Sequence, residues 1–174
     1  MDDILARLRR LESILEIQHV MFTYAECVDL ASFDDLGALF AHGTLGASGS
    51  GVAMRGHEQI RDFYAATNKV HGDGTLRTRH LSTNAIIQID PSGDLATARS
   101  YFVVLQATDE VPLQPIVAGR YHDTFHVVDG GWCFADRLIF VDQIGDMHDH
   151  LSFDLRTDPV PDVAGMKHGA ATVE

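Results

Sequence analysis

Basic side chains are scarce in this 174-residue chain, which carries 13 Lys and Arg against 25 Asp and Glu. The resulting formal charge of −12 opposes nucleic-acid binding, because contacts to phosphates require clustered Lys and Arg. It also opposes adsorption to anionic membrane surfaces, which attract polybasic segments. The charge balance therefore predicts neither a nucleic-acid nor a membrane partner.

Long apolar runs and targeting signals are also missing. No stretch approaches the roughly 20 apolar residues that a membrane-spanning helix needs. The acidic opening Met1-Asp2-Asp3 is unlike a secretory signal, which begins with basic residues followed by an apolar segment. These features predict a cytoplasmic protein.

Cysteine is nearly absent, and the two that occur, Cys27 and Cys133, lack the spacing of a metal site. Without a signal for export, free thiols are the expected state rather than a disulfide. The sequence also contains no glycine-rich phosphate loop after a strand and no nucleophile elbow. The common sequence signatures of zinc, nucleotide and serine-hydrolase sites are thus excluded.

The N-terminal third has the pattern of helices. Apolar residues recur at intervals of three and four from Ile4 to Val28, which predicts one long helix or two helices with a bend. Shorter helices are expected from Ser32 to Phe40 and after Gly56. The segment 43–51, rich in Gly, Ser and Ala, is expected to be a loop or a weak first strand.

The remainder of the domain has the pattern of strands. Alternating side chains separated by turn residues predict four of them, over residues 80–90, 95–108, 112–128 and 132–142. Helices followed by an antiparallel meander indicate an α+β domain, with the helices packed on one face of a curved, mainly antiparallel sheet. We expect this domain to span residues 1–145. Residues 146–174 show little periodicity, and we expect a tail that is partly disordered or covers the domain surface.

The strand over residues 95–108 is apolar on both of its faces. A sheet covered by helices on one side only should present one polar face. The second face is therefore predicted to pack on another copy of the chain, in a dimer or trimer.

Two polar residues, Asp29 and His80, are candidates for acid–base chemistry. His80 ends the run Thr75-Leu76-Arg77-Thr78-Arg79-His80 at the start of a predicted strand, and Asp29 follows the long helix. An imidazole paired with a carboxylate is a general base near neutral pH. If the fold brings the two together, the chain has the central pair of an enzyme active site.

Structural interpretations of the same residues remain open. Regular alternation groups Leu81, Ile87 and Ile89 as the core face of their strand, which would turn His80 outward. Asp29 also suits a helix-end turn.

Other polar residues also have structural alternatives. Tyr24 suits the core with a solvated hydroxyl, and Arg120 with Asp123 suits a cross-strand pair. The run Asp146-Met147-His148-Asp149-His150 has a metal-binding composition, but it lacks a third ligand at suitable spacing and is interpreted as a solvated polar turn.

Three phrases in the chain resemble a known family. Gly56-His57-Glu58-Gln59-Ile60 opens a helix, Gly119-Arg120-Tyr121-His122-Asp123-Thr124-Phe125 lies in a strand, and Asp129-Gly130-Gly131-Trp132 precedes the last strand. Their order and spacing resemble the SnoaL-like branch of the nuclear-transport-factor-2-like superfamily, from Leu5 to Asp142. Within it, the phrase ending in His80 is similar to one of scytalone dehydratase, and the Asp–His pair is similar to that of hexachlorocyclohexane dehydrochlorinase.

The resemblance implies a cone-shaped α+β barrel around an apolar pocket. Asp29 and His80 would be its catalytic residues, and its substrate-binding residues would be Tyr24, Asn84, Tyr121 and Asp123. The implied activity is that of a dehydratase-like lyase or isomerase, which removes a proton from a hydrophobic cyclic or aromatic molecule. No metal or organic cofactor is needed for such an elimination.

Two other classes of function remain open for a member of this family. One is a non-catalytic SnoaL-like protein that binds an apolar small molecule in its pocket. The other is an accessory subunit similar to the small subunit of ring-hydroxylating dioxygenases.

Overall fold

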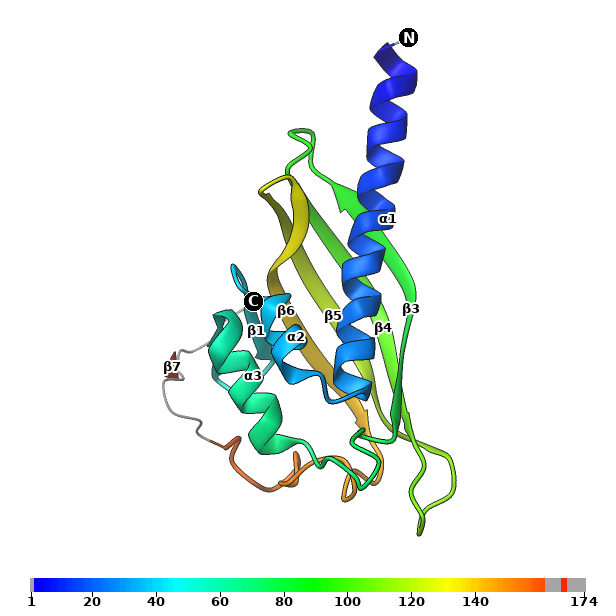
Figure 1. Cartoon of the computed structure of the whole chain (residues 1–174), viewed down its shortest axis with the longest axis vertical. Coiled ribbons are helices and arrows are strands. Elements are labelled where there is room, and N and C mark those ends of the chain that lie inside the picture. Colours follow the sequence, from blue (N-terminus) through cyan, green and yellow to red (C-terminus); the bar gives the residue numbers. More distant parts are fainter. Residues whose placement is uncertain (1, 162–166, 169–174) are drawn as a thin grey trace.

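The computed structural model describes residues 2–161 and 167–168 (Figure 1). Helix α1 (Asp2–Asp29) is a single long helix, followed by α2 (Phe33–Ala38) and α3 (Gly56–Thr67). The C-terminal half of α1 buries an apolar stripe at helical spacing, formed by Ile17, Met21, Tyr24 and Val28. Its N-terminal half extends beyond the sheet (Figure 1).

Helix α1 ends in a turn that fixes its last residue. Ala31 adopts a left-handed backbone with φ of 54°, and its N–H donates to the Val28 carbonyl at 3.0 Å. The Ser32 N–H donates to the Cys27 carbonyl at 2.9 Å. This pair of bonds is the Schellman arrangement, which satisfies carbonyls that the helix end leaves free. Asp29 is consequently held at a rigid helix end rather than in a loop.

The sheet has the strand order β3-β4-β5-β6-β1-β2-β7. Its four long strands form an antiparallel meander: β3 (Thr78–Ile89), β4 (Leu95–Gln106), β5 (Gln114–Val128) and β6 (Gly131–Ile144). Three short strands extend the sheet from β6, namely β1 (Thr44–Ala47), β2 (Val52–Arg55) and β7 (Lys167–His168). The predicted α+β class and mainly antiparallel sheet are confirmed.

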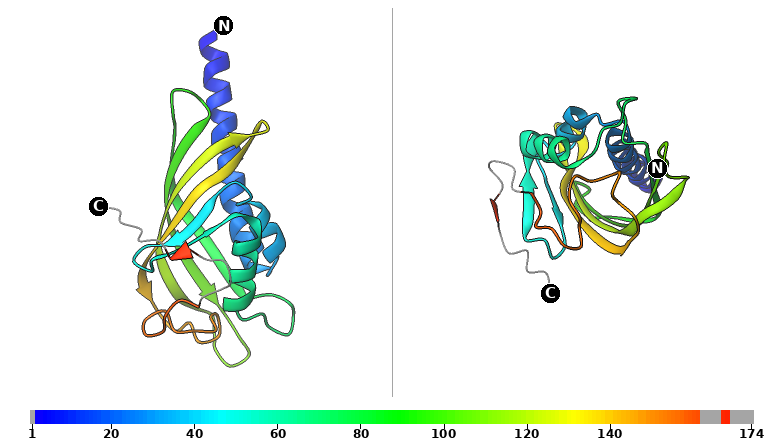
Figure 2. Two further views of the ribbon diagram at one scale, coloured as in Figure 1. Left: turned by 90° about the vertical axis from the view of Figure 1, so that its left-hand side faces the viewer. Right: turned by 90° about the horizontal axis from the view of Figure 1, so that it is seen from below.

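Two details of the sheet differ from the expectation. The first is that β1 pairs with β6 in parallel, so the sheet is mixed. The second is that β3 and β7 are unpaired edges in the described chain, so the sheet does not close into a barrel. It instead curves around the buried end of α1, with the helices on its concave side (Figure 2).

A β-bulge interrupts β3 in its middle. The register with β4 shifts between Thr83 and Ile86, and Asn84 adopts a left-handed backbone with φ of 54°. Before the bulge the even-numbered residues are the more buried, and after it the odd-numbered residues are. The bulge therefore exchanges the two faces of the strand. His80, which precedes the bulge, faces the helices, and so do Ile87 and Ile89, which follow it.

The structure also bears on the predictions for the cysteines, for membrane-spanning helices and for the outer face of the sheet. Cys27 and Cys133 are both free thiols, as expected. No helix in the described part of the chain is long and apolar enough to span a membrane. Tyr101 on the outer face of β4 is 54% exposed, so this face of the sheet lacks a cover within the described chain.

Candidate active site

Asp29 and His80 form a directly bonded pair. Their Oδ1 and Nδ1 atoms lie 2.6 Å apart, and the His80 backbone N–H donates to Asp29 Oδ2 at 3.0 Å. The Thr78 hydroxyl donates to Asp29 Oδ1 at 2.6 Å. Helix α1 thus supplies the carboxylate, and the first three residues of β3 supply every hydrogen bond described here for it.

The carboxylate of this pair is ionised at neutral pH. Burial raises the pKa of Asp29, but the hydrogen bonds and charge of His80, together with Thr78, outweigh it and leave the pKa below its ordinary value. Because an ionised carboxylate only accepts hydrogen bonds, Nδ1 of His80 must carry the proton. The lone pair of the imidazole is then on Nε2, the nitrogen that Asp29 does not hold.

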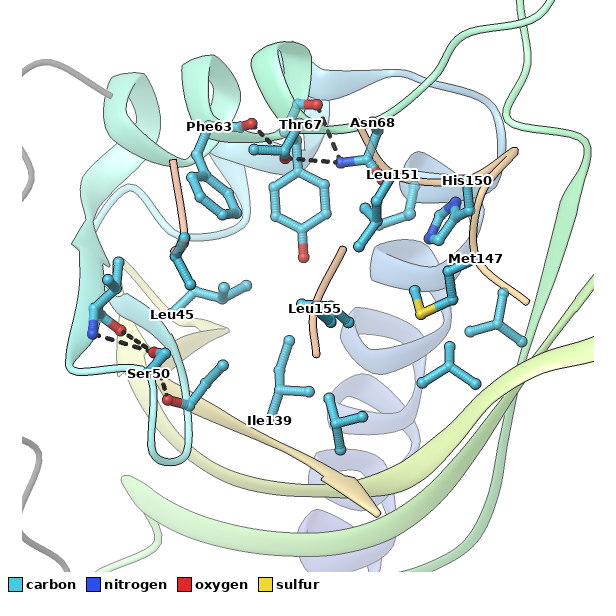
Figure 3. Close-up of a pocket in the computed structure, with 18 of the residues that line it drawn as sticks. Leu45, Ser50, Phe63, Thr67, Asn68, Ile139, Met147, His150, Leu151 and Leu155 are labelled. Carbon is cyan, nitrogen blue, oxygen red and sulfur yellow. Dashed lines mark hydrogen bonds between the residues drawn. The ribbon is translucent and has the colours of Figure 1, made fainter. Parts of the chain in front are cut away.

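His80 lies in the wall of an apolar cavity of about 160 Å³. Figure 3 shows other residues of this wall, among them Leu45, Phe63 and Ile139. Helices α1 and α3, strands β1 to β6 and the segment after β6 all contribute to its wall. The apolar lining includes Val28, Leu45, Phe63, Phe102, Val104, Ile139, Leu151 and Leu155. A basic nitrogen at a predominantly apolar wall suits a ligand that is largely hydrophobic and carries an acidic C–H bond.

A cluster of tyrosines forms another part of the wall. Tyr24 and Tyr121 line the cavity, as does Tyr64 of α3, which the sequence analysis did not single out. The hydroxyls of Tyr24 and Tyr64 lie 2.6 Å apart. Burial raises the pKa of all three tyrosines, so these side chains are neutral phenols that donate hydrogen bonds at physiological pH.

Behind the tyrosines lies a buried ion pair. Arg137 of β6 donates from Nε to Asp123 Oδ1 at 2.8 Å and from Nη2 to Oδ2 at 2.7 Å. Both side chains are fully buried. The guanidinium carbon lies 4.1 Å from the ring centroids of both Tyr24 and Tyr121, so this pair supports the tyrosine wall from behind.

Two of the expected substrate-binding residues are away from the cavity. Both carboxylate oxygens of Asp123 accept hydrogen bonds from Arg137, and Asp123 does not line the cavity in the described chain. Asn84 is exposed at the bulge of β3, where an αL backbone suits Asn. The cross-strand pair of Arg120 with Asp123 is not formed either, because Arg120 binds Asp142 at 2.7 Å.

The segment 146–161 adds a second histidine to the wall. His150 lines the cavity and is only 5% exposed, whereas the His148 side chain is 83% exposed. The interpretation of residues 146–150 as a solvated polar turn is therefore wrong for His150. A turn in which the His150 N–H donates to the Met147 carbonyl at 2.9 Å directs the two histidines to different surroundings.

The fold and the site define a class of protein: a curved sheet and a long helix enclose an apolar cavity, and a histidine in its wall binds an aspartate at the end of the helix. The SnoaL-like domain matches residues 9–137, and the chain belongs to this family, as the resemblance in the sequence indicated. None of the curated proteins compared with the chain matches it.

Solved structures share the fold. Rv3472 of Mycobacterium tuberculosis, a protein of unknown function, is 27% identical, with a TM-score of 0.66 over 78% of this chain and 75% of that chain. An NTF2-like protein with a cystatin-like fold from Novosphingobium aromaticivorans is 21% identical, with a TM-score of 0.68 over 81% and 89%. A candidate scytalone dehydratase from the same organism is 25% identical, with a TM-score of 0.64 over 84% and 91%.

Proposed function

We propose that the protein is a cofactor-independent lyase or isomerase that removes a proton from a hydrophobic cyclic or aromatic carbonyl compound. The observation that carries this proposal is the bond of 2.6 Å between Asp29 and His80, whose imidazole lies in the wall of an apolar cavity. Similarity to a candidate scytalone dehydratase also supports a dehydratase-like reaction.

The proposed reaction begins at Nε2 of His80. Its lone pair takes the proton from the carbon next to the carbonyl, and the electrons of the broken C–H bond form an enolate. The ionised Asp29 stabilises the imidazolium that results, and a neutral phenol at the wall, Tyr24, Tyr64 or Tyr121, donates to the enolate oxygen. Positioned acid–base groups of this kind contribute about 10²–10⁴-fold in rate.

The imidazolium of His80 then returns its proton. In a dehydration it protonates a hydroxyl on the neighbouring carbon, the C–O bond breaks, water leaves and a C=C bond forms. In an isomerisation it protonates a different carbon of the enolate. Both routes regenerate the neutral imidazole without an external oxidant or reductant.

The test uses β-tetralone, a bicyclic ketone with acidic C–H bonds, in deuterated water. The wild-type protein should catalyse exchange of the ketone's α-protons for deuterium, followed by NMR or mass spectrometry. His80→Ala should lower this exchange by about 10²–10⁴-fold while retaining ketone binding. His148→Ala, at an exposed position outside the cavity, is the matched control and should exchange at the wild-type rate.

The alternative of a binding protein predicts a different outcome for the same experiment. The predominantly apolar lining of the cavity favours this second candidate as well. A protein that binds β-tetralone without accelerating exchange would be a small-molecule carrier rather than an enzyme. Equal exchange by wild type and His80→Ala would contradict the role of His80 as base.

We also propose that the chain forms a homo-oligomer through the outer face of its sheet. Leu81, Ile86 and Tyr101 are 46%, 54% and 54% exposed on β3 and β4, and a second copy would bury them. Size-exclusion chromatography with light scattering should give a dimer or trimer for the wild type and a monomer for Tyr101→Glu. A wild-type monomer at micromolar concentration would refute this assembly.

A further inference from the structure

His150 is the one cavity-lining histidine besides His80 among the described residues. Its side chain is 5% exposed, and its Nδ1 atom is buried without a hydrogen-bond partner in the described chain. The ring centroids of His150 and His80 lie 6.1 Å apart, and no hydrogen bond joins the two rings. The other ring nitrogen, Nε2, has no hydrogen bond in the described chain and is not among its buried unpartnered atoms, so it is the nitrogen that a ligand in the cavity can reach.

The position of His150 is fixed by the chain on both sides. The Lys69 N–H donates to its carbonyl at 2.9 Å, and the side-chain amide of Gln106 donates to the preceding carbonyl, that of Asp149, at 3.0 Å. The Thr108 hydroxyl donates to the Asp149 carboxylate at 2.9 Å. Strand β4 and the loop after α3 therefore anchor the turn that carries His150, and its ring is preorganised at the cavity.

The electrostatic surroundings of the two cavity histidines differ. His80 has a carboxylate on Nδ1 that stabilises its charged form, whereas His150 has no such contact in the described chain. Burial, together with the neighbouring His80, lowers the pKa of His150 to about 3 against the opposing effect of Asp29. At neutral pH the His150 imidazole is consequently uncharged, with one nitrogen that donates and one that accepts.

We propose that His150 is a second substrate-contacting residue, a neutral hydrogen-bond partner for an oxygen of the ligand whose acidic C–H bond lies at His80. This inference rests on the proposed function, because it takes His80 as the base. It deepens that function by naming the substrate class: an apolar ring compound with a carbonyl or hydroxyl oxygen close to the carbon that loses its proton. The two imidazoles would contact the ligand from two different parts of the chain: His80 from β3 and His150 from the segment after β6.

The test compares two ligands of the same bicyclic shape. β-Tetralone carries a carbonyl oxygen, and tetralin does not. His150→Phe should weaken β-tetralone binding by about tenfold, the size expected when one buried hydrogen bond is lost, and should leave tetralin affinity within about twofold. His148→Phe, on the same segment but exposed, is the matched control and should change neither affinity. Isothermal titration calorimetry of the wild type and the two variants with each ligand measures these affinities.

The binding test is independent of turnover, which separates this inference from the proposed function. Unchanged β-tetralone affinity in His150→Phe would overturn the role of His150, even if deuterium exchange by the wild type proceeds. Conversely, absent exchange together with lost ketone selectivity would refute the lyase proposal and retain His150 as a ligand contact. An equal loss of affinity for both ligands would show that His150 only shapes the wall, and this too would overturn the inference.

An experiment on the wild type covers the case in which His150→Phe does not fold. Long-range proton–nitrogen correlation NMR should show a neutral His150 at neutral pH. One of its nitrogen resonances should move on addition of β-tetralone and stay in place on addition of tetralin. Identical responses to the two ligands would contradict a hydrogen bond to the ligand oxygen.

Discussion

Two carboxylates of this protein, Asp29 and Asp123, each hold a basic side chain through short hydrogen bonds, yet the two pairs differ in access. The imidazole of His80 touches Asp29 with one nitrogen and lies in the cavity wall. The guanidinium of Arg137 is fully buried, bound to Asp123 by two hydrogen bonds and flanked by aromatic rings. The imidazole of the first pair is therefore accessible to a ligand in the cavity, whereas both groups of the second pair are enclosed by protein.

This difference indicates that a carboxylate–base pair can catalyse proton transfer only when its base can gain and lose a proton next to a ligand. Arg137 has its already high pKa raised further by Asp123, so it stays charged at any physiological pH. His80 is an imidazole, a group that can take up a proton as a general base and return it as a general acid. We therefore assign Arg137 and Asp123 to the support of the tyrosine wall and Asp29 and His80 to the proposed reaction.

The largest effect on stability is expected for the enclosed pair. Arg137→Met leaves Asp123 as an uncompensated buried charge and should reduce the free energy of unfolding by about 3–5 kcal/mol. Urea denaturation followed by circular dichroism measures it. The double variant Asp123→Leu with Arg137→Met removes both charges and should regain most of this loss. A single variant as stable as the wild type would contradict a structural role for the pair.

The cavity pair should respond in activity more than in stability. Asp29→Asn keeps an oxygen acceptor but loses the charge, so we expect a loss of about 1–3 kcal/mol in unfolding free energy. Exchange of β-tetralone protons should fall by about 10²–10⁴-fold, measured as for His80→Ala. If Asn at this position retained full exchange, the stabilisation of an imidazolium by Asp29 would be excluded.

His150 should also make the stability of the fold depend on pH. The unfolded chain protonates His150 at its ordinary pKa of 6.5, whereas the folded protein does so only at about 3. Between these values the unfolded state binds more protons, so stability should fall with falling pH, by on the order of 1 kcal/mol per pH unit. The titratable groups facing His150 are His80 on β3, Asp29 on α1 and His71 in the loop after α3.

The pH effect is measured by urea denaturation of wild type and His150→Phe between about pH 4.5 and 6.5. Asp29 does not interfere in this window. Because its pKa is lowered in the folded protein, the stabilisation that it contributes is fully present above its ordinary pKa of 3.8 and is lost only at lower pH. The variant should show a flatter dependence, and His148→Phe should match the wild type. Parallel curves for wild type and His150→Phe would contradict the neutral, buried state of His150.

The smallest effect is expected at the third pair, Arg120 with Asp142. Both side chains are 40% exposed, and solvent screens the attraction within such pairs. Arg120→Ala should therefore leave the midpoint of urea denaturation close to that of the wild type and leave exchange of β-tetralone protons unaffected. A loss as large as that of Arg137→Met would break the distinction between enclosed and exposed pairs.

Much of the fold follows from local patterns in the sequence. The spacing of apolar residues from Ile4 to Val28 predicted the long helix, and alternation with turn residues predicted the four long strands. The short strand β1 was expected as a loop or a weak strand, because the Gly- and Ser-rich segment 43–51 has little strand propensity, and β2 was not predicted. The pairing of β1 depends on β6, which lies about 90 residues later in the chain.

The candidate site was only partly predictable. The family resemblance brought Asp29 and His80 together, while regular alternation in β3 turned His80 outward. The bulge at Asn84 explains the discrepancy, because one irregular residue exchanges the two faces of a strand. Tyr64, Arg137 and His150 were missed, since each gains its role from a partner or cavity wall distant in sequence.

The sequence by itself determined the order and type of the long elements, the acidic charge and the residues capable of acid–base chemistry, because these depend on neighbouring residues and composition. Tertiary structure alone decided which of those residues meet. The choice of Arg137 rather than Arg120 for Asp123 depends on strand register, and the burial of His150 depends on a turn docked against β4. Such contacts join residues far apart in the chain, and their energies arise only when packing excludes water from between them.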